Sequence, residues 1–247
     1  KASNKVKNFF KKLLPSIFSS GITQINILIG TIIASYEGGA VSYLYYADRV
    51  YQINLAIAGI AVGTVSLPAL SKAFKNRNIK KLSNIQSKSF ELSLLLSIPA
   101  SLGLILASEE IINSLFGYGS FSEKDVKLTA DALKYFGYGV PAFALVKILS
   151  NFFFARDNTK TPLYISIFMV IINISISVSL FASYGFIIIP IATSISTWIG
   201  VLIYIYLLNE KNSLLLNKKL IPNFIKILTS TIITVSYTHL TLPTTPY

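Results

Sequence analysis

Long apolar runs are the feature that most constrains this chain. No charged residue lies between Lys160 and Glu210, and several other stretches are nearly free of charge. A helix that crosses the hydrocarbon core of a bilayer needs about 20 predominantly apolar residues. The mean hydropathy is +0.61, and 13% of the 247 residues are charged, against about 25% in an ordinary soluble domain. These properties exclude most soluble enzymes, disordered tails and fibrous proteins, and they leave a polytopic membrane protein.

The apolar runs predict seven membrane segments, at residues 15–36, 40–70, 85–107, 126–154, 163–182, 186–208 and 222–235. The seventh is too short to span a bilayer. We therefore expect an all-α, polytopic transmembrane bundle of six full helices and a truncated seventh, with a membrane domain over residues 15–235. Residues 1–14 form a basic segment that we place in the cytoplasm. Because the chain opens with Lys1 inside this basic stretch, it reads as the middle of a longer protein.

The last twelve residues break the pattern, because apolar continuity stops after Val235. Residues 236–247 read as a translated sequencing adapter or cloning scar, which fold reasoning should exclude. We expect them to be irregular, poorly packed or without supporting contacts, and a native hairpin turn is the alternative. The single histidine, His239, lies in this tail and is given no role.

The distribution of Lys and Arg predicts the orientation. Of these 22 residues, 17 fall before or between segments on one side, three fall on the other side, and Arg49 and Lys147 lie inside segments. Cytoplasmic loops of membrane proteins carry an excess of Lys and Arg. The side with 17 is therefore expected to be cytoplasmic.

Residues with catalytic or ligand-binding chemistry are scarce. The chain has no cysteine, which excludes a disulfide framework, Cys-ligated zinc and a thiol nucleophile. It contains neither a nucleophile elbow nor a P-loop. We predict no catalytic residue, no metal ligand and no cofactor. The net charge of +12 is interpreted as a mark of cytoplasmic loops, so nucleic acid is not an expected partner.

Arg49 is the main candidate for a binding residue. It lies about nine residues inside segment 40–70, roughly 14 Å along a helix, which favours a wet cavity or a partner over lipid. Tyr45 and Gln52 share its helical face. A guanidinium presents its donors in a planar fork that matches phosphate. The alternative is an ion pair with Asp48 or with a carboxylate on another helix, and for Asp48 we favour that structural role.

Other polar residues inside the segments have structural alternatives. Lys147 could extend its long stem to the interface near Arg156 or line a cavity, and both interpretations stay open. For Gln24, Asn26 and Asn173 we favour hydrogen bonds between helices over contact with a ligand. Gly59 and Gly63 form a G-x-x-x-G pattern, which is typical of close helix packing.

Several motifs carry a family resemblance. The most specific is Ala47-Asp48-Arg49, followed in register by Gly63-Thr-Val-x-Leu-Pro68, and the connection Ala155-Arg-x-x-Thr-Lys-Thr-Pro162 is nearly as specific. Together with Gly21-Ile-Thr-Gln-Ile-Asn26 and Leu115-Phe-Gly-Tyr-Gly-Ser-Phe121, they resemble the MurJ/MviN family of lipid II flippases. This family belongs to the multidrug/oligosaccharidyl-lipid/polysaccharide exporter superfamily. The resemblance covers roughly residues 5–235 and implies one lobe of an exporter fold, helices seven to thirteen of fourteen.

The resemblance implies a transporter of the bacterial cytoplasmic membrane that acts in peptidoglycan synthesis. Lipid II, or a similar polyprenyl-diphosphate sugar lipid, would bind in a cavity between two lobes, and rocking of the lobes would expose it outside. Arg49 and Lys147 would contact the diphosphate. The supporting residues would be Tyr45, Asp48, Gln52, Gln24, Asn26 and Asn173. Membrane lipids and the N-terminal lobe, which this chain lacks, are the other implied partners, so the chain alone is expected to be inactive.

Two departures limit what the resemblance carries over. Many members have an acidic residue where this chain has Gly30, and the family associates that acid with a cation site that also uses a polar residue near Asn173. A sodium site of that type is therefore in doubt. Asn151-Phe152 stands where Pro-Gly is usual. Another exporter of the superfamily, for a drug or a different lipid-linked sugar, is the alternative function, and a structural membrane scaffold is the alternative from a different class.

Overall fold

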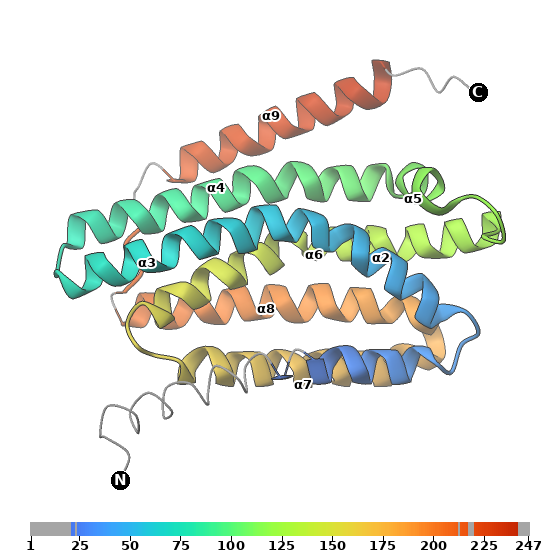
Figure 1. The fold of residues 1–247 in the computed structure, drawn as a ribbon, viewed down its shortest axis with the longest axis horizontal. Helices are drawn as coiled ribbons and strands as arrows, with labels where there is room; N and C mark the ends of the chain where they lie inside the picture. Colours follow the sequence, from blue (N-terminus) through green and yellow to red (C-terminus); the bar gives the residue numbers. More distant parts are fainter. Residues whose placement is uncertain (1–20, 23, 212, 217–219, 242–247) are drawn as a thin grey trace, which may run out of the picture.

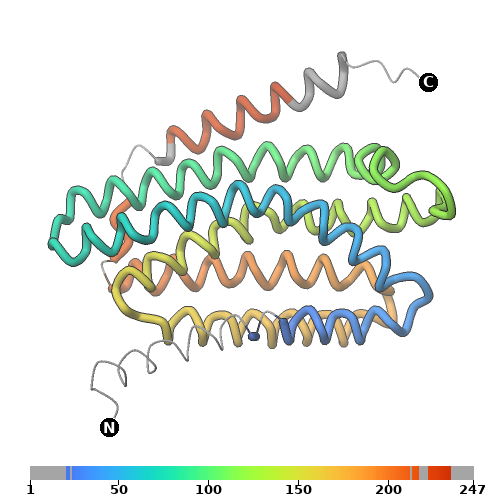
Figure 2. Tube along the Cα trace, in the orientation of Figure 1, coloured from blue at the N-terminus to red at the C-terminus, as the bar shows by residue number. Residues whose placement is uncertain are grey.

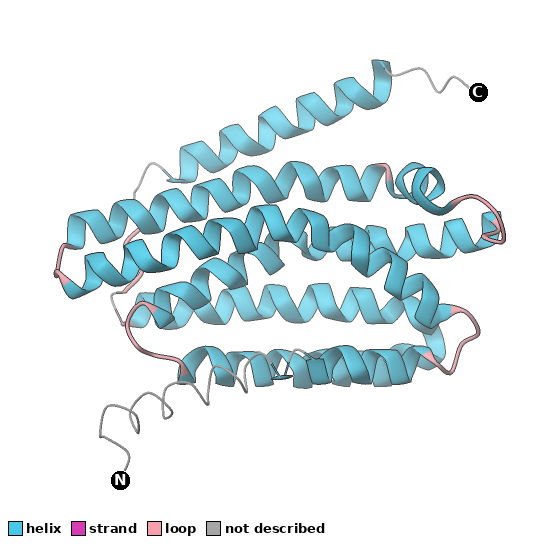
Figure 3. Cartoon of the chain, viewed as in Figure 1, coloured by secondary structure: helices cyan, strands magenta, loops and turns pink. Residues whose placement is uncertain are grey.

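The computed structural model describes residues 21–22, 24–211, 213–216 and 220–241, and every regular element in that part of the chain is helical (Figures 1 and 3). The first helix covers Gln24–Ala34. The others are α2 (Ala40–Leu55), the π-helix η1 (Ala56–Ala61), α3 (Val62–Lys75), α4 (Ile79–Leu106), α5 (Ser108–Phe116), α6 (Glu123–Phe154), α7 (Lys160–Tyr184), the short η2 (Gly185–Ile187), α8 (Ile188–Glu210) and α9 (Leu220–Thr241).

The helical bundle predicted from the apolar runs is confirmed. Four stretches in the described residues are long and apolar enough to cross a membrane: Ala40–Lys75, Ile79–Leu106, Glu123–Phe154 and Lys160–Glu210. The last stretch contains two helices, α7 and α8, which pack against each other. Each predicted segment from 24 onward corresponds to a helix or a continuous helical stretch. The part of the first segment before residue 21, and the basic segment 1–14, lie outside the described residues.

The C-terminal helix extends beyond the predicted end of the membrane domain at Val235. Helix α9 runs beside α4 (Figure 2), and its backbone is helical through Thr241. The irregular backbone expected from residue 236 onward is therefore not found at 236–241. Residues 236–241 contain no Gly or Pro, and these are the two residue types that most disfavour a helix interior. The first such residue is Pro243, which disfavours the α conformation in the residue before it. Residues 242–247 lie outside the described part of the chain.

Helix α6 forms the centre of the bundle, packed against α2, α3, α4, α5 and α8 (Figure 1). Pro141 lies inside α6 and has no N–H to donate to the carbonyl of Gly137, four residues earlier. Ser101 of α4 donates to that carbonyl at 2.7 Å. In a membrane, a polar backbone group without a partner costs several kcal/mol, so the hydroxyl of α4 compensates for the proline of α6.

The basic connections gather at one end of the bundle. Arg156, after α6, donates to the carbonyls of Phe152 and Ser213 at 2.6 and 2.7 Å, and its guanidinium lies 5.6 Å from the ring centre of Phe74. Partial burial lowers the pKa of this guanidinium. Buried Gln86 also holds the segment after α8: its amide group bonds the carbonyl of Ser213 and the N–H of Leu215.

The remaining connections lie at the opposite end (Figure 3). The Glu37 carboxylate accepts from the N–H of Phe186 at 2.8 Å, which ties the turn before α2 to η2. The Tyr43 hydroxyl donates to Asp125 at 2.7 Å, and Ser122 and Asp125 form a capping box at the start of α6. Helix α5, which no apolar run predicted, also lies at this end. It is short and amphipathic, with Glu109 and Glu110 in its first turn.

Candidate functional site

The helix that carries Arg49 is bent. Residues 56–61 between α2 and α3 form a π-helix, and Figure 1 shows the axis changing direction between α2 and α3. Single-turn π-helical insertions bend helices and are frequent at functional sites. Gly59 lies in this turn, where a Cβ would stand 3.1 Å from the Cα of Ala144 on α6. The close packing predicted from the Gly59–Gly63 pattern is therefore confirmed.

Asn151 completes the contact between α3 and α6. Its side-chain amide donates to the carbonyl of Gly63 at 2.8 Å. Sequence reasoning treated Asn151 only as a departure from a usual Pro-Gly pair. In the structure it adds a hydrogen bond between α3 and α6.

Arg49 is exposed on α2, and its guanidinium lies over the ring of Tyr45, 4.7 Å from the ring centre. Tyr45 is itself 54% exposed. Ile53, Ile57 and Ile60 leave large apolar surfaces along the same helical stretch. The guanidinium thus has one face on an aromatic ring and its N–H groups open to a ligand, an arrangement that suits a cation held ready for an anion.

Asp48 has a different partner from its neighbour. The Gln52 amide donates to the Asp48 carboxylate, and the Tyr51 hydroxyl lies beside the same carboxylate. Tyr45, Arg49 and Gln52 were predicted to share one helical face. In the structure they belong to two separate contacts, with Tyr45 beside Arg49 and Gln52 beside Asp48. The sequence favoured an ion pair with Arg49 for Asp48, but Asp48 is bonded to Gln52 and lies beside Tyr51 instead. The Arg49 guanidinium is left for another function.

Asn173 is the centre of a small polar cluster between helices. It donates to Asn26 at 3.0 Å and to the Thr193 hydroxyl at 3.2 Å, and it accepts from Ser177 at 3.2 Å. The hydrogen bonding favoured for Asn26 and Asn173 is therefore present. Gly30, one turn beyond Asn26, faces Ile189 of α8.

This cluster does not fit a sodium ion. Every oxygen in it is neutral, and the amide and hydroxyl groups already bond one another, whereas hard cations prefer carboxylate and carbonyl oxygens that are free to coordinate. In the part of the chain that the structure describes, no group of three or more His, Cys, Asp or Glu comes together.

Lys147 and Gln24 stay apart from these contacts. Both side chains are exposed, Lys147 on α6 and Gln24 on the first helix. Within the described residues, neither forms a hydrogen bond to Arg49 or Asn173. The structure therefore leaves both readings of Lys147 open, as an interfacial side chain and as a second cation of the site.

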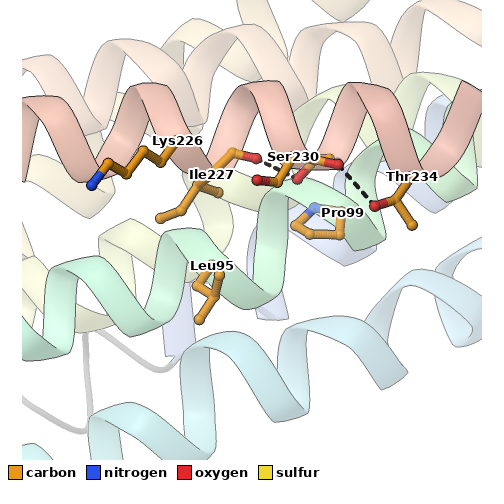
Figure 4. A pocket seen from close by; sticks show the side chains of 7 residues that line it. Leu95, Pro99, Lys226, Ile227, Ser230 and Thr234 are labelled. Atoms are coloured by element: carbon orange, nitrogen blue, oxygen red, sulfur yellow. Dashed lines mark hydrogen bonds between the residues drawn. The ribbon is translucent and has the colours of Figure 1, made fainter.

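Cavities border the described part of the bundle. One, of about 380 Å³, lies between α4 and α9 and is shown in Figure 4, with Lys226 as its charged lining residue. Its other walls are mainly apolar, because the Thr231 and Thr234 hydroxyls donate to carbonyls of their own helix. The second, of about 320 Å³, is lined by aromatic residues of α2, α5 and the loop before α6.

The second cavity contains residues that sequence reasoning did not assign. They are Tyr46, Phe116, Tyr118, Ser120 and Phe121. Four of them belong to the motif 115–121, which the sequence showed only as part of a family resemblance. The alternation of aromatic residues with Gly117 and Gly119 was the available signal, because glycines in a tight loop can bring the flanking rings to one side.

Comparisons with known proteins agree with this architecture. The family model described as "Lipid II flippase MurJ" matches residues 1–245. A relative from Rhizobium meliloti (strain 1021), named a probable lipid II flippase MurJ, is 41% identical over 198 residues, which cover 80% of this chain and 37% of the relative. A relative of the same name from Rickettsia prowazekii (strain Madrid E) is 41% identical over 202 residues, 81% of this chain and 40% of the relative.

A solved structure shows the same arrangement of helices. It is described as lipid II flippase MurJ in an inward closed conformation, and it superposes with a TM-score of 0.84 at 28% identity, over 100% of this chain and 51% of the solved chain. The fold defines part of a polytopic, all-helical membrane protein. The chain belongs to the MurJ family, and it spans about two-fifths of the length of the curated relatives named above.

Proposed function

We propose that the full-length protein containing this chain is a lipid II flippase, and that this chain supplies the lobe whose Arg49 contacts the lipid diphosphate. The observation that carries the proposal is the exposed guanidinium of Arg49 on the bent α2–α3 helix, seated on Tyr45 and not bonded to Asp48. Membership of the MurJ family and the names of the relatives support the choice of cargo.

An anionic cargo agrees with the charge of this site. A diphosphate is too costly to move through hydrocarbon, so its path needs water and cations. Arg49 provides a cation on the exposed face of α2, and the neighbouring carboxylate, Asp48, is partly buried and bonded to Gln52. A cationic drug, the cargo of the alternative exporter, would be repelled by the same guanidinium.

Transport requires a second lobe in this proposal. The solved relative is about twice as long as this chain, and alternating access needs two bodies that move against each other around a site near the bilayer midplane. The Arg49 face would line the gap between this lobe and the N-terminal lobe. Lys147 would be a weaker second contact to the diphosphate.

The function is tested by depletion of the full-length protein in its host bacterium. We expect lipid II in the outer leaflet to fall while lipid II in the cytoplasmic leaflet accumulates, because synthesis continues when export stops. The measurement is the fraction of lipid II that an externally added enzyme can modify. An unchanged fraction after depletion would exclude a flippase for this cargo.

The orientation is a separate prediction, based on the positions of Lys and Arg. We expect the end of the bundle that carries Lys80 and Arg156 to face the cytoplasm, and the end that carries α5 to face outward. A membrane-impermeant thiol reagent added to intact cells should label Ser114→Cys but not Lys80→Cys, each introduced alone into a cysteine-free full-length protein. Both side chains are exposed. Labelling of Lys80→Cys alone would reverse the orientation.

A further inference from the structure

The aromatic pocket at the α5 end of the bundle has the properties of a sugar-binding subsite. We define it by its lining residues, Tyr46, Phe116, Tyr118, Ser120 and Phe121. The ring of Tyr46 lies 4.8 Å from that of Phe116 and 5.5 Å from that of Phe121, measured between ring centres. These three rings form a packed wall around a cavity of about 320 Å³, near the lower end of the range for small-molecule sites.

The loop between α5 and α6 supplies Tyr118, Ser120 and Phe121 to the lining of the aromatic pocket. Gly119 has φ +67°, a conformation that residues with a Cβ rarely adopt, and it directly follows Tyr118. Tyr118 is 72% exposed, although it lines the pocket. A ring that is so largely exposed contributes little to the packing of the bundle. The position of Tyr118 at the pocket is therefore better explained by contact with a ligand.

The chemistry of the lining favours a sugar ring over a hydrocarbon chain. One face of a hexose presents C–H groups, which pack on aromatic faces, and its edge presents hydroxyls. The aromatic pocket offers both kinds of partner, because its lining includes the rings of Phe116 and Phe121 and the hydroxyl-bearing residues Tyr46, Tyr118 and Ser120. A hydrocarbon chain would leave those hydroxyls without partners, which is unfavourable once water is excluded.

Tyr45 connects the aromatic pocket to Arg49. Its ring centre lies 4.7 Å from the guanidinium carbon of Arg49 and 6.1 Å from the ring centre of Tyr46. In a glycosyl diphosphate lipid, the first sugar is bonded directly to the diphosphate. A diphosphate at Arg49 therefore places that sugar within reach of the pocket wall.

We propose that the aromatic pocket binds a hexose ring of the diphosphate-linked sugar while Arg49 holds the diphosphate. This inference rests on the proposed function, since it uses the same ligand and extends the contact from the diphosphate to the sugar. It assigns to Tyr118 and Phe121 a role in recognising the head group.

The test compares two lipids on the purified full-length protein. One is farnesyl diphosphate, and the other is farnesyl diphosphate that carries one N-acetylhexosamine. The measured quantity is the dissociation constant of the sugar-free lipid divided by that of the lipid with the sugar. This ratio isolates the contribution of the sugar to binding. We expect Tyr118→Ala to lower this ratio about threefold to tenfold, as the loss of one stacking contact implies, and to leave binding of the sugar-free lipid unchanged.

Three further variants separate stacking from general effects. Tyr118→Phe keeps the ring and should keep most of the ratio. Phe121→Leu keeps an apolar side chain but removes the ring, so the ratio should fall. Tyr36→Ala is the matched control, because Tyr36 is 81% exposed in the turn before α2 and does not line the pocket; its ratio should match that of the unaltered protein.

The outcomes distinguish this inference from the proposed function. If Tyr118→Ala and Phe121→Leu keep the ratio of the unaltered protein, or weaken both lipids equally, the sugar assignment is wrong. If Tyr36→Ala lowers the ratio as much as Tyr118→Ala does, the tyrosines serve as interfacial anchors and the assignment also fails. If Arg49→Ala leaves the affinity for farnesyl diphosphate unchanged, the diphosphate site of the proposed function fails, whatever the ratio.

Discussion

Arg49→Ala in the full-length protein is expected to abolish support of growth while the protein is still made and inserted. The guanidinium is exposed and stacked on Tyr45, so its removal leaves no buried group without a partner. What is lost is a charged hydrogen bond to the ligand, about 1.5–3 kcal/mol, which corresponds to roughly a ten- to hundredfold weaker affinity. The measurements are complementation of a depletion strain and the protein level in the membrane fraction.

Asp48→Asn is the companion variant that separates binding from folding. If Arg49 and Asp48 formed a buried ion pair, loss of either partner would destabilise the fold by about 3–5 kcal/mol, and both variants would lower the protein level alike. In the structure Asp48 is bonded to Gln52. We therefore expect Asp48→Asn to be milder than Arg49→Ala, with growth largely maintained.

Arg49→Lys tests the geometry of the contact. It keeps the charge but loses the planar fork of donors, so partial function at best is expected. Normal growth of a strain whose only copy is a well-expressed Arg49→Ala protein would end the proposal. Equal loss of protein in the Arg49→Ala and Asp48→Asn strains would instead assign Arg49 to folding.

The helices could be predicted from the sequence because the bilayer imposes a simple requirement. A span needs about 20 apolar residues with every backbone group bonded internally, and this requirement is visible in any window of the sequence. The ends of the helices could not be predicted in this way. Helix α4 begins at Ile79, in a charged stretch before the predicted segment, because Asn78 caps it by accepting from the N–H of Lys81.

The π-helix at residues 56–61 gave no signal in the apolar pattern. The wider turn inserts within a run of small and apolar residues, so hydropathy is the same with or without it. The G-x-x-x-G pattern did predict close packing there, because a missing side chain on one helix can be recognised without knowledge of its partner. That the partner is Ala144 of α6 depends on tertiary structure.

For the site, the sequence predicted which residues were unusual but not all of their partners. A charged pair inside an apolar run stands out, and a helical face of Tyr45, Arg49 and Gln52 follows from a period of 3.6 residues. Rotamers then decide that Gln52 bonds Asp48. The aromatic pocket depends on the approach of α5 to Tyr46 across a large separation in sequence, which no local pattern contains.

Gly59→Val is expected to disrupt packing of the bundle. A Cβ at this position would stand 3.1 Å from the Cα of Ala144 and 3.0 Å from the Cδ1 of Leu55. The Ala144 contact is with backbone, which cannot rotate away, and valine adds two further methyl groups. Overpacking of a tight interface typically costs about 1–3 kcal/mol and occasionally more. The thermal unfolding midpoint of the purified full-length protein and its level in membranes should both fall.

Gly103→Val on α4 is the matched control. The substitution is identical and also lies inside a helix, but a Cβ at Gly103 meets nothing within 4 Å. Any general effect of valine in a helix is therefore shared, and only the contact with α6 differs. Gly63→Ala should fall between the two, because its nearest neighbour is the end of the Asn151 side chain, which can move aside at the expense of its bond to the Gly63 carbonyl. Equal midpoints for Gly59→Val and Gly103→Val would show that the bend at η1 tolerates a wider separation from α6, and that the glycine is not required for this contact.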